Sequence, residues 1–106
     1  PITAGILTTI YCEPADSFDL PGLADLYENL YGRDGFVRIL GEGCFANTSN
    51  VVRSNFVDVG WVYDERKGAL ILSSAEDNLG KGAASQAIQS FNIMSGLPED
   101  CGLQNF

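Results

Sequence analysis

The sequence feature that most constrains this chain is a stretch of turn-forming and small residues at positions 77–87. In it, Asp77 and Asn78 precede Lys81, which lies between two glycines, and alanines then begin a helical pattern. The polar side chains can cap a helix, and the nearly bare backbone lets another surface approach closely. A helix N-terminus beside a cation also suits an anion, because its amides and dipole point toward negative charge. The residues alone leave both interpretations open: a capped helix packed closely on a sheet, or an anion-binding turn.

The composition is that of one small globular domain. The 106 residues are 45% hydrophobic and 19% charged, and 14 acidic against 6 basic residues give a net charge of −8. This acidity argues against nucleic acid or an anionic membrane as a partner. No apolar run approaches the roughly 20 residues that span a bilayer, and no signal-peptide pattern opens the chain.

The chain contains no histidine, so neither a Ser-His nor a Cys-His catalytic pair can form within it, and imidazole ligation of a metal is excluded. Its cysteines, Cys12, Cys44 and Cys101, form no C-x-x-C pair, which indicates free thiols in a reducing compartment and no metal site. Cys44 lies in a polar loop without a nearby base, and we expect it to be unreactive.

The hydrophobic pattern predicts a series of strands and helices. In order, these are a strand at 5–11, a helix at 19–32, a strand at 36–40, a long strand at 51–63, a strand at 69–74 and a helix at 81–95. The charged turn at 64–68 predicts a hairpin between the last two strands. This order predicts an α+β fold, with a mostly antiparallel or mixed sheet of about four strands and helices packed on one face.

Three polar residues, Arg53, Ser54 and Asn55, place a cation, a hydroxyl and an amide together at the start of the long predicted strand. Such a group can orient a carboxylate or phosphate, with the guanidinium binding through two donors. The same residues can instead satisfy the backbone of a loop, and the sequence leaves both possibilities open.

Several segments carry a family resemblance. They include 5–7 (GIL), 26–31 (LYENLY), 36–40 (FVRIL), 54–60 (SNFVDVG), 74–89 (SAEDNLGKGAASQAIQ) and 94–98 (MSGLP). In order and spacing, they resemble the C-terminal part of the N-acetyl-gamma-glutamyl-phosphate reductases, the arginine-biosynthesis branch of the semialdehyde dehydrogenase family. The resemblance covers nearly the whole chain.

The resemblance implies a two-domain, NADP-dependent enzyme of which this chain is one part. An N-terminal Rossmann domain would hold the cofactor and a nucleophilic cysteine, and a catalytic histidine would lie a few residues before Pro1. Residues 1–78 would then belong to the dimerisation and substrate domain, and residues 79–106 would be a helix and tail that return to the nucleotide-binding domain. The chain alone would contain no catalytic residue and would be inactive.

The implied reaction reduces N-acetyl-gamma-glutamyl phosphate to the N-acetylglutamate semialdehyde. The resemblance assigns the cofactor contact to Asn78, with Leu79 and Gly82 beside it. We assign binding of the anionic substrate to Arg53, Ser54, Asn55 and Lys81. We further expect a homo-oligomer formed through the sheet, in the cytoplasm or, in a eukaryote, an organelle.

Some residues depart from the family pattern. Ala4 stands where the family often has an arginine, so the substrate could also be an aminoadipyl or aspartyl phosphate. Glu76 stands where the family usually has an apolar residue, and Gly80 stands where it usually has a larger one. Two other functions remain open: a stand-alone, dimerising α+β module that binds a small molecule without catalysis, and a thiol enzyme that uses Cys44.

Overall fold

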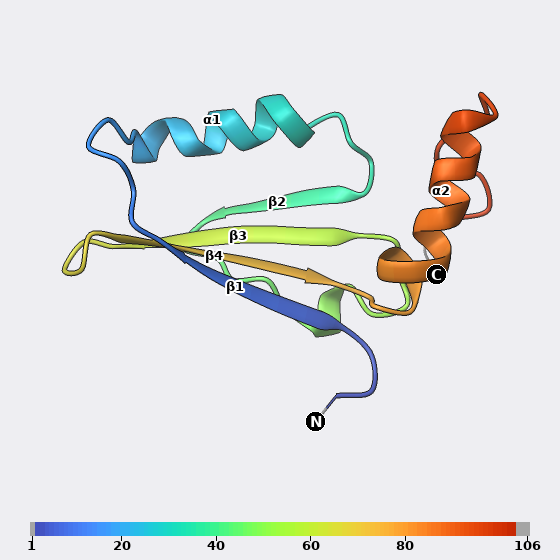
Figure 1. Ribbon diagram of the computed structural model, residues 1–106, viewed down its shortest axis with the longest axis horizontal. Helices are drawn as coiled ribbons and strands as arrows, with labels where there is room; N and C mark the ends of the chain where they lie inside the picture. Colours follow the sequence, from blue (N-terminus) through green and yellow to red (C-terminus); the bar gives the residue numbers. More distant parts are fainter. Residues whose placement is uncertain (1, 104–106) are drawn as a thin grey trace.

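The computed structural model describes residues 2–103 and has a four-stranded sheet at its centre (Figure 1). The strands are β1 (Ile6–Cys12), β2 (Val37–Glu42), β3 (Val57–Asp64) and β4 (Ala69–Glu76), and their order across the sheet is β1-β4-β3-β2. β4 pairs antiparallel with both β1 and β3, whereas β2 runs parallel to β3. The predicted α+β fold with a mixed sheet is therefore confirmed, and so is the hairpin at 64–68. The end of the predicted segment 79–106, residues 104–106, lies outside the described residues.

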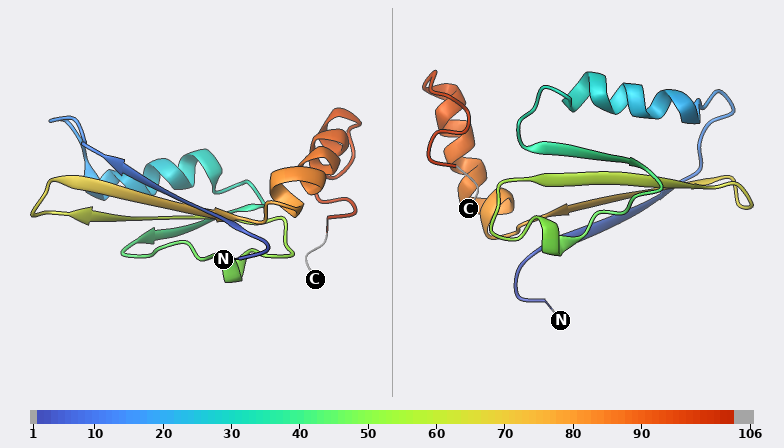
Figure 2. Two further views of the ribbon diagram at one scale, coloured as in Figure 1. Left: turned by 60° about the horizontal axis from the view of Figure 1, so that its bottom comes forward. Right: turned by 180° about the vertical axis from the view of Figure 1, so that it is seen from behind.

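One helix covers the sheet and the other extends away from it (Figures 1 and 2). α1 (Leu20–Tyr31) lies along one face, with Asp19 and Gly32 at its ends as predicted. α2 (Ser85–Met94) begins after a π-helical turn, η2 (Gly80–Ala84), at the end of the sheet where β4 finishes. The prediction that both helices pack on one face therefore holds for α1 but not for α2. None of the helices described within residues 2–103 is long and apolar enough to cross a membrane.

The core beneath α1 is built around Trp61. Trp61 is buried with Leu23 from α1 and Leu70 from β4, and the ring of Tyr27 stacks on it at a centroid distance of 5.0 Å. Alternation along β3 directs Trp61 toward α1, because successive strand residues point to opposite faces. The helical spacing of Leu23 and Tyr27 provides the matching apolar surface.

A loop covers part of the opposite face. Val51 and Ala46 from this loop pack on Ala75 of β4, and all three side chains are buried. The predicted long strand at 51–63 is wrong in its first half, since β3 begins only at Val57. The reason is local: Arg53 has φ = +63°, which interrupts an extended strand, and the apolar Val51 is buried in a turn after the 3₁₀ helix η1 (Thr48–Asn50).

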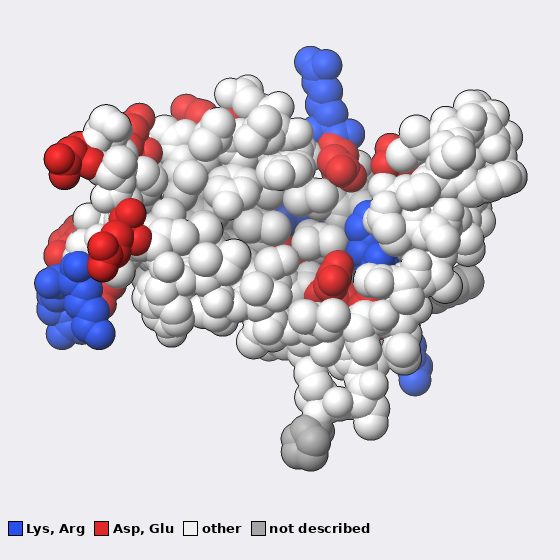
Figure 3. Space-filling view, viewed as in Figure 1, with Lys and Arg blue, Asp and Glu red and all other residues white. Residues whose placement is uncertain are grey.

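The rest of this face is bare, and charge lies mostly elsewhere. On β1, Leu7, Thr9 and Tyr11 are exposed, and Tyr11 retains 75% of its accessible surface. By contrast, acidic and basic residues gather at the end of the sheet that carries the β3–β4 turn, residues 64–68 (Figure 3).

Candidate functional site

The end of the sheet where β4 finishes brings together three segments that are distant in sequence. These are the residues before β1, the loop at 51–56 and the turn at 77–82. The side-chain oxygen Oδ1 of Asn78 accepts a hydrogen bond of 2.7 Å from the amide of Gly5. Gly5 has φ = +105°, and a side chain there would press against Thr48, so a glycine is required at this contact.

Asp77 lies at the centre of this arrangement and is only 4% exposed. Its Oδ1 accepts hydrogen bonds from the amides of Leu79, at 2.8 Å, and Gly80, at 3.2 Å, while its Oδ2 accepts from the amide of Arg53 at 2.5 Å. Burial alone would raise the pKa of Asp77, but the three amides outweigh it and hold that pKa below its ordinary value. The carboxylate is therefore charged near neutral pH and joins two segments of backbone.

The glycines of the π-helical turn allow it to fold closely. The amide of Gly82 donates to the carbonyl of Asp77 at 2.8 Å. A Cβ atom on Gly82 would lie 3.3 Å from that carbonyl oxygen, and one on Gly80 would lie 3.2 Å from the carbonyl oxygen of Ser54. The small residues at 77–87 thus serve close packing at this turn, and the turn explains why the regular helix starts at Ser85 rather than at the predicted position 81.

Lys81 and Asn55 converge on Gln89 of α2. Lys81 Nζ donates to Gln89 Oε1 at 2.5 Å, and Asn55 Nδ2 donates to the same oxygen at 3.1 Å. Gln89 Nε2 in turn donates to a carboxylate oxygen of Glu99 at 2.6 Å, and the ammonium of Lys81 lies 5.3 Å from the ring centroid of Phe36. Both residues were predicted to bind substrate. In the structure Asn55 fastens α2 to the 51–56 loop, whereas Lys81 joins Gln89 to the turn that precedes the helix.

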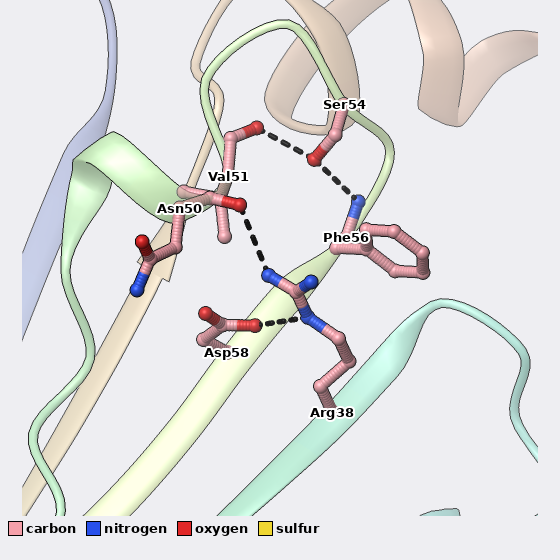
Figure 4. A network of polar contacts seen from close by, with 6 residues as sticks. All are labelled: Arg38, Asn50, Val51, Ser54, Phe56 and Asp58. Carbon is pink, nitrogen blue, oxygen red and sulfur yellow. Dashed lines mark hydrogen bonds and ion pairs between the residues drawn. The ribbon is translucent and has the colours of Figure 1, made fainter. Parts of the chain in front are cut away.

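The other two predicted substrate residues lie apart from this cluster. Ser54 Oγ donates to the carbonyl of Val51 at 2.6 Å and accepts from the amide of Phe56 at 3.2 Å, so it closes its own loop (Figure 4). The side chain of Arg53 is exposed and lines a shallow hollow together with Ala4 and Thr48. Among the four residues predicted to bind substrate, Arg53 is thus the one that presents its charge on the surface.

Sequence reasoning missed the buried ion pair between Arg38 and Asp58. Arg38 Nε lies 2.6 Å from Asp58 Oδ1, and Asp58 is only 1% exposed (Figure 4). The guanidinium also donates to the carbonyl of Asn50 at 3.0 Å and lies 4.3 Å from the ring centroid of Phe56. The sequence held a signal for this pair, because Asp58 lies between two valines in a predicted strand. A buried carboxylate loses its hydration and therefore needs a charged partner. The pair anchors the 51–56 loop to the sheet.

The outer side of α2 is apolar and uncovered. We call the exposed residues of this surface the α2 stripe: Ala84, Ala87, Ile88, Phe91 and Met94. Met94 retains 87% of its accessible surface and Phe91 62%. The helix therefore exposes an apolar patch on its outer side. Within residues 2–103, no group of three or more acidic or cysteine side chains gathers in a way that could hold a metal ion.

Comparison with known proteins identifies the family. Residues 1–78 match the family described as semialdehyde dehydrogenase, dimerisation domain. The chain is 50% identical over 105 residues to the N-acetyl-gamma-glutamyl-phosphate reductase of Geotalea daltonii, a match that covers 99% of this chain and 30% of the relative. The reductases of Akkermansia muciniphila and Shouchella clausii are 48% and 45% identical, over 97% and 98% of this chain and again 30% of their own length. The chain thus spans about 30% of the length of these relatives. It belongs to the semialdehyde dehydrogenase family, whose dimerisation domain its residues 1–78 match.

Proposed function

We propose that this chain is part of an N-acetyl-gamma-glutamyl-phosphate reductase that acts in arginine biosynthesis in the cytoplasm, or in an organelle of a eukaryote. The observation that carries the proposal is the identity of 45–50% to reductases of that name over nearly the whole chain. In this proposal the catalytic histidine lies in the remainder of the protein, because this sequence lacks histidine. The family resemblance assigns the catalytic cysteine to the N-terminal Rossmann domain. The chain by itself would then be inactive.

The contribution we assign to this chain centres on Asn78. The amide of Gly5 donates to one end of its carboxamide, so that end must be the oxygen and the NH₂ group must point the other way. No described residue accepts a hydrogen bond from that NH₂ group. It can therefore donate to the carboxamide oxygen of a nicotinamide and fix the orientation of the ring. NADPH would supply the hydride for reduction of the acyl group.

The surroundings of Asn78 support docking of a nucleotide-binding domain. Leu79 and Gly82 are exposed on the same turn, and the α2 stripe continues this uncharged surface along the helix. An apolar surface of this kind marks an interface. We propose that residues 1–78 form the dimerisation and substrate domain, and that residues 79–106 contact the Rossmann domain of the same protein.

The test of the proposal is the full-length enzyme with Asn78→Asp. The aspartate keeps an oxygen for the amide of Gly5, so the contact between the two segments survives, while an oxygen replaces the NH₂ donor and adds one negative charge. We expect kcat/KM for NADPH to fall by roughly 10- to 100-fold, the cost of one hydrogen bond in a closed site, with acyl-phosphate-dependent consumption of NADPH as the measurement.

The matched control is Asn29→Asp, which adds the same charge on the exposed side of α1 and should leave kcat/KM unchanged. If Asn78→Asp retains kcat/KM within about twofold of the wild type, Asn78 does not bind the nicotinamide. If the wild-type enzyme consumes no NADPH with N-acetyl-gamma-glutamyl phosphate, the proposed function itself is wrong.

A further inference from the structure

One carboxylate joins the loop that carries Arg53 to the turn that carries Asn78. Oδ1 of Asp77 accepts from the amides of Leu79 and Gly80 and thereby shapes the turn around Asn78. Oδ2 accepts from the amide of Arg53, 24 positions earlier in the chain. A helix cap requires only the first of these contacts, so the second has to be explained separately.

The contact falls on a strained residue. Arg53 has φ = +63°, and it is the one non-glycine residue with positive φ within residues 2–103. A side chain with a β-carbon is disfavoured in this conformation, and such residues persist where the surrounding structure holds them. The hydrogen bond from the amide of Arg53 to Asp77 is one such restraint, and the resulting corner points the guanidinium into the hollow beside Ala4.

The geometry requires a carboxylate rather than an amide at position 77. Both oxygens of Asp77 accept hydrogen bonds, whereas an asparagine has one oxygen and one NH₂ group. In either orientation, an asparagine would place N–H groups against the amide of Arg53 or against those of Leu79 and Gly80. No basic side chain of residues 2–103 forms an ion pair with Asp77, so the backbone amides alone stabilise its charge.

We infer that Asp77 is a positioning residue of the reductase. Its two oxygens set the placement of Arg53, as the group that binds the anionic acyl phosphate, relative to Asn78, as the group that binds the nicotinamide. The inference rests on the proposed function. It adds that one buried carboxylate, that of Asp77, aligns the acyl phosphate with the nicotinamide.

The test is a double-mutant cycle in the full-length enzyme with Asp77→Asn and Arg53→Gly. Glycine adopts positive φ without strain, so Arg53→Gly removes the guanidinium while the loop keeps its path. We expect each single variant to raise KM for the acyl phosphate by roughly 10- to 100-fold, because a small misplacement of a binding group is costly. We expect the double variant to be no worse than Arg53→Gly, since the guanidinium that Asp77 positions is then absent.

A purely structural role for Asp77 predicts a different result. The two losses would then multiply, and Asp77→Asn would reduce kcat with every substrate instead of raising KM for the acyl phosphate; either result would overturn the inference. If Asp77→Asn does not fold, Asp77→Ser takes its place in the cycle, because serine retains a capping oxygen and is too short to bridge to Arg53.

Hydrogen exchange separates this inference from the proposed function. In Asp77→Asn, we expect faster amide exchange in the 51–56 loop, with unchanged exchange in β3 and β4. Unchanged exchange in the loop would show that Asp77 does not hold the loop in place, and it would overturn the inference even if the enzyme is an active reductase. A wild-type enzyme without reductase activity would instead refute the proposed function, whatever the exchange data show.

Discussion

At the scale of single residues, the loop that covers part of the second face of the sheet is held by backbone contacts as much as by side chains. Gly60 of β3 lies directly beneath the carbonyl of Cys44, and a Cβ atom at position 60 would collide with that carbonyl. Beside it, Ser73 Oγ accepts from the amide of Ala46 at 2.9 Å. Gly60 and Ser73 are partners across β3 and β4, so this one point of the sheet holds the loop.

We predict that Gly60→Ala destabilises the protein by about 1–3 kcal/mol, the usual cost of an added methyl group in a filled interior. Denaturant unfolding followed by circular dichroism measures the change. Gly35→Ala is the matched control, because a Cβ at position 35 meets nothing within 4 Å and should change stability by less than about 0.5 kcal/mol. Equal stability of the two variants would show that the loop can move away from the sheet.

Residue roles were predictable from sequence only where they depend on local chain geometry. The sequence predicts a cap from Asp77 or Asn78, because acceptors before a run of small residues serve the nearest amides. In the structure Asp77 is the one that accepts from the amides of Leu79 and Gly80. The alternative that Ser54 satisfies its own loop was open in the sequence, and the contacts of Ser54 with Val51 and Phe56 agree with it. The turn of Lys81 toward Gln89 was not predictable, because it depends on the π-helical turn that precedes α2. The assignments of Asn78, Leu79, Gly82 and Arg53 to ligands remain predictions.

At the scale of elements, α2 is attached to the rest of the molecule by polar side chains. Gln89, 5% exposed, and Asn92, 3% exposed, lie one turn apart on its inner side. Asn92 Nδ2 donates to the carbonyls of Glu99 and Cys101, which folds the following segment back along the helix. A buried polar network of this kind fixes an orientation, because each member is costly to leave unpaired.

We predict that Gln89→Leu loosens α2 without unfolding the sheet. The change leaves Lys81 and Asn55 without their shared acceptor, which should cost about 1–3 kcal/mol at this contact. Hydrogen exchange should then accelerate in 85–94 while β3 and β4 stay protected.

The matched control for α2 is Gln86→Leu, since Gln86 is exposed and, among residues 2–103, its side chain hydrogen-bonds only to Ser90 of its own helix, at 3.4 Å. Slow exchange in α2 of the Gln89→Leu protein would mean that apolar contacts, not this network, hold the helix.

Elements were predictable where a single periodicity runs through them. β1, α1 and β4 were all found from their apolar spacing, with ends within a few positions of those observed. Residues 51–56 were assigned to a strand because Val51, Val52 and Phe56 are apolar, but their burial serves a turn. The position of α2 could not be inferred, because its apolar stripe indicates that some other surface covers the helix but does not identify that surface.

At the scale of the whole molecule, the face of β1 opposite α1 is open to solvent. Leu7, Thr9 and Tyr11 point to that side and are exposed, and the family is described as a dimerisation domain. Few charges interrupt this surface, whereas the 64–68 turn carries many. These observations support association through the sheet.

We predict that Tyr11→Asp together with Leu7→Asp shifts the protein toward monomer. Two carboxylates on each copy would be desolvated and brought near like charges in a contact between the sheets, so the dissociation constant should rise at least about 100-fold. Sedimentation velocity across a concentration series measures the effect.

As a control, Leu30→Asp places one such carboxylate on the exposed side of α1 and should leave the sedimentation coefficient as in the wild type. An unaltered mass distribution of the β1 double variant would place the oligomer contact elsewhere.

The pairing of β1 with β4 also bears on how the chain folds. β3 and β4 are adjacent in sequence and form a hairpin, whereas Ile6 meets Glu76 across an intervening span of about seventy residues. Closing so long a loop is slow compared with forming a hairpin. β1, although synthesised before the other three strands, therefore has to wait for β4, and until then its unpaired edge is open to wrong pairing with other chains.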